Sequence, residues 1–260
     1  MCVIVLKFKG ADFPSRQVIA ACMKENPHGF AAAWNQDGTL MTFRTMDEAE
    51  MLAKYDEIRR LDPATTGLVF HARIATHGSK TLANCHCWTD DAGELAFAHN
   101  GVLTNVGSRD DMTDSETFFR DIFLPVRKAG GMKLAWKVAG AVIGSSKFAF
   151  IGHDGNILPM GQYSKDCEPG HKGMIYFSNM HWTRHTEPMF PFDKPVPRKK
   201  NPAKTTAEAL RLRDIREAAE RSALRRPGSI IVERNDDGSI KDVYVKDLLR
   251  KDPPEAGRLF

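Results

Sequence analysis

The order of the predicted strands and helices is what most restricts the fold of this chain. Turn sequences such as residues 35–38 (NQDG) and 153–156 (HDGN) separate short β-branched and hydrophobic runs, which predicts strands that follow one another in groups. The helical patterns also come in groups, without the regular strand–helix alternation of a doubly wound parallel sheet, so the pattern favours an α+β fold. Strands are predicted over 3–8, 29–34, 39–43, 67–73, 94–99, 147–151, 156–160 and 174–178, and helices over 14–26, 46–60, 114–125 and 132–143.

The chain changes in composition after residue 187. Residues 188–202 contain five prolines and an Arg-Lys-Lys run, which is typical of a linker. Eleven basic and four acidic residues between positions 194 and 226 give this part a charge of +7, against +4 for the whole chain. We therefore expect a main domain over 2–187, a basic proline-rich linker over 188–203, and an appendage over 204–260 with a basic helix at 204–225 and a hairpin of strands 229–234 and 240–245.

Three roles are open for the basic arm. It can dock a partner protein, or it can be a solvated helix that lies against the main domain, since charge runs are usually exposed faces. Nucleic-acid binding is the weaker alternative, because four acidic residues interrupt the basic face and no aromatic side chain offers a stacking platform.

The sequence predicts a cytoplasmic protein that does not enter a membrane. No run approaches the roughly 18 apolar residues that a membrane helix needs, and the first ten residues have neither a basic leader nor a small-residue cleavage site. The five cysteines are odd in number and irregular in spacing, which argues against a disulfide framework. We expect them to be reduced.

Cys2 stands in an unusual place, directly after the initiator methionine and before a predicted buried strand. Small penultimate residues permit removal of Met1, which would give Cys2 a free α-amine. A thiol with a pKa of about 8.5 would then lie beside an amine with a pKa of about 7.7–8.0, and this amine can take the thiol proton near neutral pH. Taken alone, however, Cys2 is more simply explained as the start of a strand.

Four further segments combine with Cys2 into a pattern. They are residues 71–78 (HARIATHG), 84–86 (NCH), 99–101 (HNG) and 113–116 (TDSE). In this order, and with these intervals, the five features resemble the class II glutamine amidotransferases. This is the N-terminal-nucleophile family that includes the glutaminase domain of glucosamine-6-phosphate synthase. The resemblance covers about residues 2–180 and does not reach 200–260.

The resemblance implies a fold and a set of roles. The fold would be the four-layer α/β/β/α sandwich of N-terminal-nucleophile hydrolases, here with a C-terminal helix and hairpin appendage. Cys2 would attack the side-chain amide of L-glutamine, with its α-amine as general base and acid. Asn100 and Gly101 would form the oxyanion hole. The remaining roles concern the substrate: Arg73 would bind its α-carboxylate, helped by backbone groups near Thr76 and His77, and Asp114 would pair with its α-ammonium.

Simpler explanations exist for the same residues. Arg73 can form a surface ion pair, Asp114 can be a helix N-cap, and Asn100-Gly101 can be an ordinary turn. Residues 85–87 (CHC) allow a zinc site with Cys167 and His171, but their spacing is not that of a zinc knuckle. We therefore predict no metal. No phosphate loop or dinucleotide motif occurs in the sequence, so we predict no cofactor.

The predicted activity is hydrolysis of L-glutamine to glutamate and ammonia through a Cys2 thioester, with the ammonia destined for an acceptor on a separate synthase or other partner protein. Two alternatives stay open. One is an amidohydrolase of the same fold that acts alone on another γ-glutamyl-type amide. The other is a non-catalytic protein of this fold that binds a partner or nucleic acid through its basic arm.

Overall fold

The computed structural model describes residues 1–75, 79–107, 112–166, 168–186, 229–234 and 240–246. The predicted linker, the helix at 204–225 and the turn of the last hairpin lie outside these residues. Strands β11 (Ser229–Arg234) and β12 (Ile240–Lys246) are described, and they pair antiparallel as the sequence predicts.

The larger sheet has six strands and carries the N-terminus near its middle. Its order is β3-β2-β4-β1-β10-β9, and every pair in it is antiparallel. Strand β1 lies between β4 and β10, which explains why its five residues are all buried. The strands are β1 (Val3–Lys7), β2 (Phe30–Gln36), β3 (Thr39–Thr45), β4 (Leu68–Ala72), β9 (Ser164–Asp166) and β10 (Ile175–Phe177).

The smaller sheet has four strands in the order β5-β6-β7-β8, and it is also antiparallel throughout. Its members are β5 (Trp88–Thr89), β6 (Leu95–Asn100), β7 (Lys147–Gly152) and β8 (Ile157–Met160). Both hairpins predicted from turn sequences are present, as β2–β3 and β7–β8. The grouping of strands in the sequence therefore reflects two antiparallel sheets in a mixed α/β protein.

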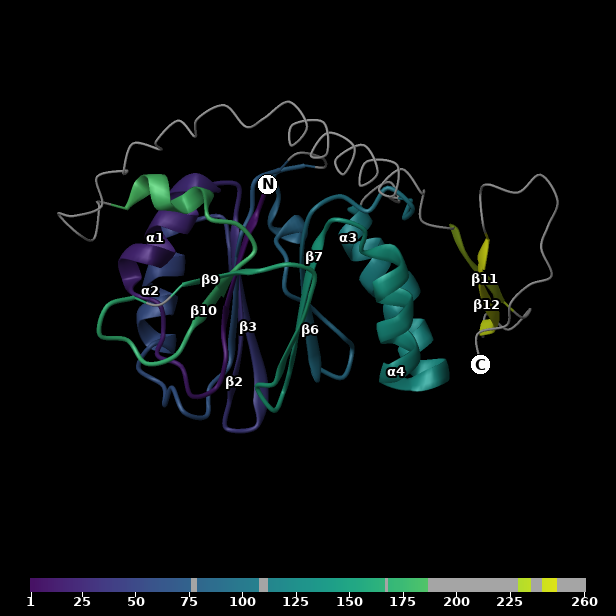
Figure 1. Ribbon diagram of the computed structural model, residues 1–260, viewed down its shortest axis with the longest axis horizontal. Helices are drawn as coiled ribbons and strands as arrows, with labels where there is room; N and C mark the ends of the chain where they lie inside the picture. The colour runs from purple at the N-terminus through teal and green to yellow at the C-terminus, as the bar shows by residue number, and fades with distance from the viewer. Residues whose placement is uncertain (76–78, 108–111, 167, 187–228, 235–239, 247–260) are drawn as a thin grey trace, which may run out of the picture.

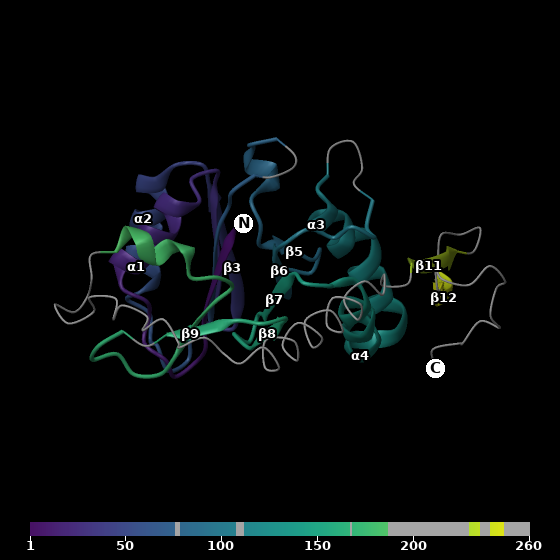
Figure 2. The same ribbon diagram turned by 45° about the horizontal axis from the view of Figure 1, so that its top comes forward.

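Helices cover the outer face of each sheet, and the inner faces meet (Figures 1 and 2). Helices α1 (Arg16–Glu25) and α2 (Glu48–Ile58) pack with the larger sheet in one core that includes Tyr55 and Phe70. Helices α3 (Asp114–Thr117), η2 (Phe118–Phe123) and α4 (Leu124–Val142) share a second core with the smaller sheet. A third core joins the sheets and is rich in alanine, whose small side chain lets the two backbones approach closely; it includes Ala31, Ala33, Ala96, Ala98 and Ala149.

The helical region after residue 113 differs in detail from the prediction. Instead of two helices separated over 126–131, helical structure continues through η2 into α4 and breaks only at Gly131. Gly131 has a φ of 75°, which a residue without a Cβ adopts readily. The break coincides with the predicted start of the second helix at 132.

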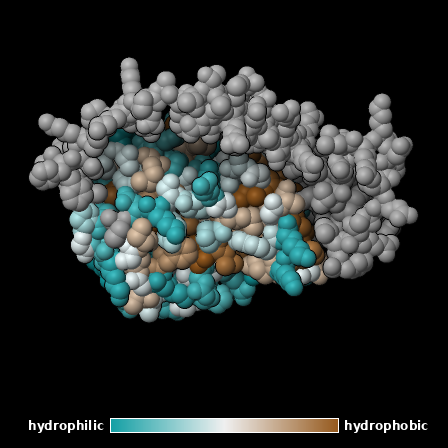
Figure 3. All heavy atoms as spheres, viewed as in Figure 1, coloured by the Kyte–Doolittle hydropathy of each residue, from teal (hydrophilic) through white to brown (hydrophobic). Residues whose placement is uncertain are grey.

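No helix among the described residues is long and apolar enough to span a bilayer. The surface in Figure 3 shows brown hydrophobic atoms between teal hydrophilic ones, as is ordinary for a folded domain.

Candidate functional site

Cys2 lies immediately before β1, at the end of a strand in the interior of the six-stranded sheet. Its side chain is half-buried, and its Sγ lies 3.6 Å from the carbonyl oxygen of Ile74, to which the thiol donates. Burial raises the pKa of the Cys2 thiol above its usual range, while the nearby positive charges of the amino terminus and Arg73 oppose this shift only in part. The thiol is therefore protonated at neutral pH, and its use as a nucleophile requires a base.

Asn100 and Gly101 lie where β6 ends, in the other sheet. Asn100 is 1% exposed and is the last residue of the strand, so it is not part of an exposed turn. Gly101 has a φ of 148°, and a Cβ at this position would come within 2.0 Å of the Ser146 hydroxyl oxygen. The backbone at Gly101 therefore requires a residue without a side chain.

The hydroxyl of Ser178 joins the two sheets at this point. Its Oγ accepts a hydrogen bond from the backbone N–H of Ile4 at 2.8 Å and another from Nδ2 of Asn100, also at 2.8 Å. Ile4 lies two residues after Cys2, so one buried hydroxyl links the start of β1 to the candidate oxyanion residue. The amide of Asn100 uses one of its two N–H groups in this bond, which leaves the second as a donor.

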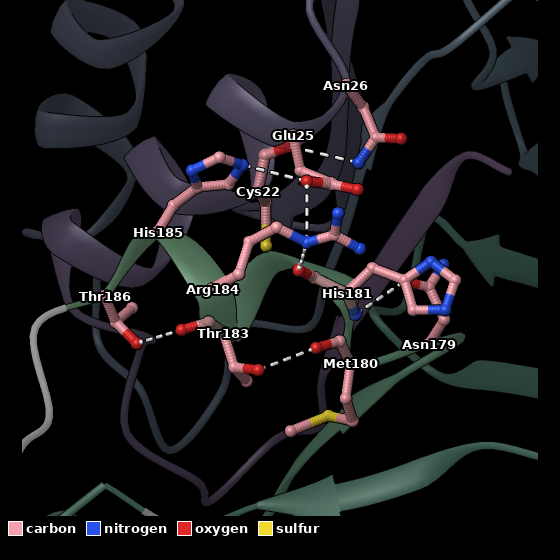
Figure 4. Close-up of polar contacts among 10 residues, drawn as sticks. All are labelled: Cys22, Glu25, Asn26, Asn179, Met180, His181, Thr183, Arg184, His185 and Thr186. Carbon is pink, nitrogen blue, oxygen red and sulfur yellow. Dashed lines mark hydrogen bonds and ion pairs between the residues drawn. The ribbon is translucent and has the colours of Figure 1, made fainter.

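Ser178 and Asn179 also belong to the candidate site, although no motif in the sequence marks them. Nδ2 of Asn179 donates to the carbonyl oxygen of Cys2 at 2.6 Å. Figure 4 shows Asn179 at the start of the segment that returns toward α1. The only available signal is that two polar residues follow the apolar run of β10. Their importance depends on the pairing of β10 with β1, which the sequence does not reveal.

Arg73 directly follows β4 and is 3% exposed, so it is not a residue of a surface ion pair. One terminal nitrogen of its guanidinium donates to the carbonyl oxygen of Ser79 at 2.9 Å. The side-chain amide of Asn84 donates to the same carbonyl at 3.1 Å, so the 79–84 segment is attached to Arg73. Thr76 and His77, the other predicted carboxylate-binding residues, lie outside the described part of the chain.

Asp114 is the first residue of α3, but the N-cap is Thr113, whose hydroxyl accepts from the N–H of Glu116. The N-cap explanation for Asp114 is therefore wrong. One carboxylate oxygen of Asp114 accepts from the N–H of Leu103 at 2.6 Å, and the other accepts from the N–H of Ser115 at 2.8 Å. These bonds fix the orientation of the carboxylate.

His99 connects the part of the candidate site around Asn100 with the part around Asp114. Its Nδ1 lies 2.6 Å from the hydroxyl oxygen of Ser115, beside Asp114, and its backbone precedes Asn100. The backbone N–H of His99 donates to Nδ1 of His86 at 3.0 Å. The ring of His86 stacks on that of His71, with 4.0 Å between the ring centroids. Burial lowers the pKa of His71 to about 3 and that of His99 to about 4, so both are neutral at pH 7.

The Cys85-His86-Cys87 segment does not gather metal ligands. Cys85 Sγ lies 3.6 Å from the sulfur of Met46, whereas Cys87 faces the carbonyl oxygen of Val69. Burial raises the pKa of Cys87 to about 12, which keeps this thiol protonated at neutral pH. Among the described residues no group of three or more potential ligands is close enough to hold an ion. Cys167, part of the alternative zinc site, is outside the described residues.

No protein-family model matches the chain. In sequence it is similar to glutamine–fructose-6-phosphate aminotransferases (isomerizing). It is 38% identical to the one from Mycolicibacterium paratuberculosis over 114 residues, which cover 40% of this chain and 18% of the relative. The Methanothermobacter thermautotrophicus protein is 49% identical over 43 residues, or 16% of this chain and 7% of the relative. The chain thus matches less than a fifth of the length of these relatives.

The chain is also similar to solved structures. The Bacillus subtilis glutamine phosphoribosylpyrophosphate amidotransferase is 14% identical, with a TM-score of 0.48, over 68% of this chain and 41% of that one. An allosteric regulatory enzyme of purine biosynthesis is 16% identical, with a TM-score of 0.48, over 71% and 43%. A glutamine aminotransferase class-II domain protein from Silicibacter pomeroyi is 14% identical, with a TM-score of 0.38, over 68% and 88%. The sequence relatives confirm the resemblance that the motifs indicate.

Proposed function

Because its sequence relatives are glutamine–fructose-6-phosphate aminotransferases, which it resembles in their glutaminase domain, we propose that this chain is a class II glutamine amidotransferase. It hydrolyses L-glutamine to glutamate and ammonia with Cys2 as the nucleophile. The observation that carries the proposal is the Ser178 hydroxyl, which holds the N–H of Ile4 and the amide of Asn100 at 2.8 Å each. This contact supports the proposal because one oxygen atom binds both the Asn100 amide and the N–H of Ile4, two residues after Cys2.

The proposal extends to the fold. Two antiparallel sheets with an alanine-rich core between them, and helices on both outer faces, fit the four-layer α/β/β/α sandwich of N-terminal-nucleophile hydrolases. In that arrangement residues 204–260 would be an appendage to the catalytic body. Its helix and hairpin are not required for the chemistry proposed here.

The reaction begins after removal of Met1. The free α-amine of Cys2 takes the proton from the thiol, which burial keeps protonated, and the sulfur forms a bond to the side-chain amide carbon of glutamine. The negative charge on the carbonyl oxygen is stabilised by the second N–H of the Asn100 amide and by the backbone N–H of Gly101. The C–N bond then breaks, the amine returns the proton to the leaving nitrogen, and ammonia departs. Water hydrolyses the remaining Cys2 thioester to glutamate.

Substrate recognition uses the two charged ends of the free amino acid. Arg73 binds the α-carboxylate, together with backbone groups near Thr76 and His77, and its buried guanidinium increases the strength of such a contact. Asp114 pairs with the α-ammonium. The hydrogen bonds from Leu103 and Ser115 orient the carboxylate for this contact without neutralising its charge.

The ammonia is used by an acceptor on a partner protein in this proposal, and the protein acts in the cytoplasm. Docking of that partner is assigned to the basic arm. If a protein truncated near Met189 keeps glutaminase activity but no longer co-purifies with a synthase-type partner, this assignment is supported. A truncated protein that is folded and inactive would contradict it.

The central test combines intact-mass measurement, a glutamate-release assay and labelling with the glutamine analogue diazo-oxo-norleucine. We expect active protein to lack Met1 and the label to lie on Cys2. A label on Cys22, Cys85, Cys87 or Cys167 would contradict the assignment of the nucleophile. Retention of Met1 would instead favour a non-catalytic protein, and turnover of γ-glutamyl amides without turnover of glutamine would favour a different amidohydrolase.

A further inference from the structure

We infer that Asn179 is a positioning residue for Cys2, which holds the peptide group of the N-terminal residue so that its amine and thiol face the substrate. The inference rests on the proposed function, because it assigns a role within that same reaction. The structural elements involved are the Asn179 side chain, the end of strand β10 and the short helix η3 (His181–His185).

The backbone pairing between β1 and β10 stops before it reaches Cys2. Regular pairs are formed by Val5 with Phe177 and by the next two residues along β1, and the N–H of Ser178 still donates to the carbonyl of Ile4 at 2.9 Å. Beyond this point, side-chain hydrogen bonds take the place of the backbone hydrogen bonds between the two strands. The Ser178 hydroxyl accepts from Ile4, and the Asn179 amide donates to the carbonyl oxygen of Cys2 at 2.6 Å.

The orientation of the Asn179 amide is determined at both of its ends. Its Oδ1 accepts from the backbone N–H of His181 at 3.0 Å, while its Nδ2 donates to Cys2. An amide turned by 180° would place oxygen against the Cys2 carbonyl oxygen and nitrogen against the His181 N–H, so neither bond could form. The donor end of Asn179 is therefore held toward Cys2.

The segment that carries Asn179 is itself attached to the body of the protein. Trp182 of η3 is 2% exposed, and its ring centroid lies 4.7 Å from that of Phe177. At the C-terminal end of α1, one oxygen of Glu25 lies 2.8 Å from Nε2 of His185 and 3.3 Å from Nε of Arg184. Figure 4 shows these contacts converging on Glu25 from the two neighbouring residues of η3.

This attachment matters most for an N-terminal residue. Once Met1 is removed, Cys2 is joined to the chain only through its carbonyl group. Rotation about its Cα–C bond then moves the α-amine and the thiol together relative to Asn100. The bond from Asn179 fixes the plane of the Cys2–Val3 peptide, and with it the position of the Cys2 Cα and the axis about which the amine and the thiol turn. Loss of orientation by about 1 Å at a reacting group can reduce a rate about 100-fold.

The test uses full-length protein with two neutral substitutions, Asn179→Ala and Asn179→Leu, so that no new charge affects the thiol. The matched control is Thr183→Ala, which removes an exposed hydroxyl in η3 that donates to the Met180 carbonyl at 2.9 Å and touches neither Cys2 nor Asn179. We expect kcat for glutamine to fall about 10- to 100-fold in both Asn179 variants. KM should stay within about twofold, because the groups that bind substrate are unchanged. Thr183→Ala should keep the wild-type kcat.

A second readout does not require glutamine turnover. The rate at which iodoacetamide alkylates Cys2 is measured against pH in protein from which Met1 has been removed, and a changed profile in either Asn179 variant supports the inference. Wild-type kcat together with an unchanged profile would overturn it, as would an equal loss of kcat in Thr183→Ala. If wild-type protein without Met1 releases no glutamate, the proposed function fails. The alkylation profiles then decide the positioning role independently.

Discussion

Replacing Ser178 by alanine is the sharpest test of the link between the two sheets. The hydroxyl accepts hydrogen bonds from the Ile4 N–H and from the Asn100 amide, and both donors are buried. In Ser178→Ala neither donor has this acceptor. We expect a loss of stability because two buried donors lose their partner, and a loss of activity because the amide of Asn100 is no longer oriented.

The magnitudes follow from the two bonds. A buried donor left without its acceptor reduces the free energy of unfolding by about 1–3 kcal/mol, so Ser178→Ala should lose about 2–6 kcal/mol. Domains of this size shift by about 2–4 °C per kcal/mol, which predicts a Tm lower by about 4–24 °C. If the Asn100 amide loses its orientation fully, kcat should fall by about 100- to 1000-fold, as when an oxyanion donor is removed.

Urea unfolding followed by circular dichroism, together with glutamate release, measures both effects. Ser164→Ala is the matched control, because Ser164 is exposed on strand β9 and its loss should change stability by no more than about 0.5 kcal/mol. A Ser178→Ala protein that unfolds at the wild-type urea concentration would refute the bonding described here. A clearly destabilised protein with wild-type kcat would refute the role assigned to Asn100.

Three further predictions concern other parts of the site. Gly101→Ala should lower kcat and stability, since its Cβ would lie 2.0 Å from the Ser146 hydroxyl oxygen, and wild-type kcat with an unchanged urea midpoint would contradict this. Arg73→Ala and Asp114→Ala should raise KM for glutamine strongly; normal values in both, in protein shown to be folded, would refute the two-ended recognition. For His71 the pKa is about 6.5 unfolded and about 3 folded, so the unfolded chain binds more protons between these values. Stability measured by urea unfolding should therefore fall as pH is lowered through this window, by up to about 1.4 kcal/mol per unit, and less steeply in His71→Gln.

Much of the fold could be predicted because its signals are local. Turn sequences and alternating or continuous apolar runs indicate hairpins β2–β3 and β7–β8 and the buried strand β1. Strands β5 and β9 were not predicted. They have two and three residues and lie at the edges of their sheets, so no hydrophobic pattern marks them. The order of the strands in each sheet also could not be predicted from the sequence, because it depends on pairing between distant segments.

The candidate site likewise contains residues that a local sequence signal marks and residues whose roles depend on pairing between distant segments. Cys2, Asn100, Gly101, Arg73 and Asp114 could be selected because their segments resemble a known family. Ser178 and Asn179 could not, since their roles exist only where β10 ends beside β1. A serine and an asparagine after a strand usually indicate no more than a turn. Here, where the β1–β10 pairing ends, the Ser178 hydroxyl binds the N–H of Ile4 and the Asn179 amide binds the carbonyl of Cys2.

The contact between His99 and Ser115 suggests why two separate segments of the sequence carry their particular residues. His99 precedes Asn100, and Ser115 follows Asp114, so the 2.6 Å contact between the His99 ring and the Ser115 hydroxyl ties the proposed oxyanion donor to the proposed ammonium-binding carboxylate. Ser115 also donates to Asp114 at 3.1 Å. A change at Ser115 is therefore expected to disturb both Asn100, through His99, and Asp114. The flanking residues of the two motifs thus help to set the distance between the group proposed to bind the glutamine ammonium and the group proposed to stabilise the reaction.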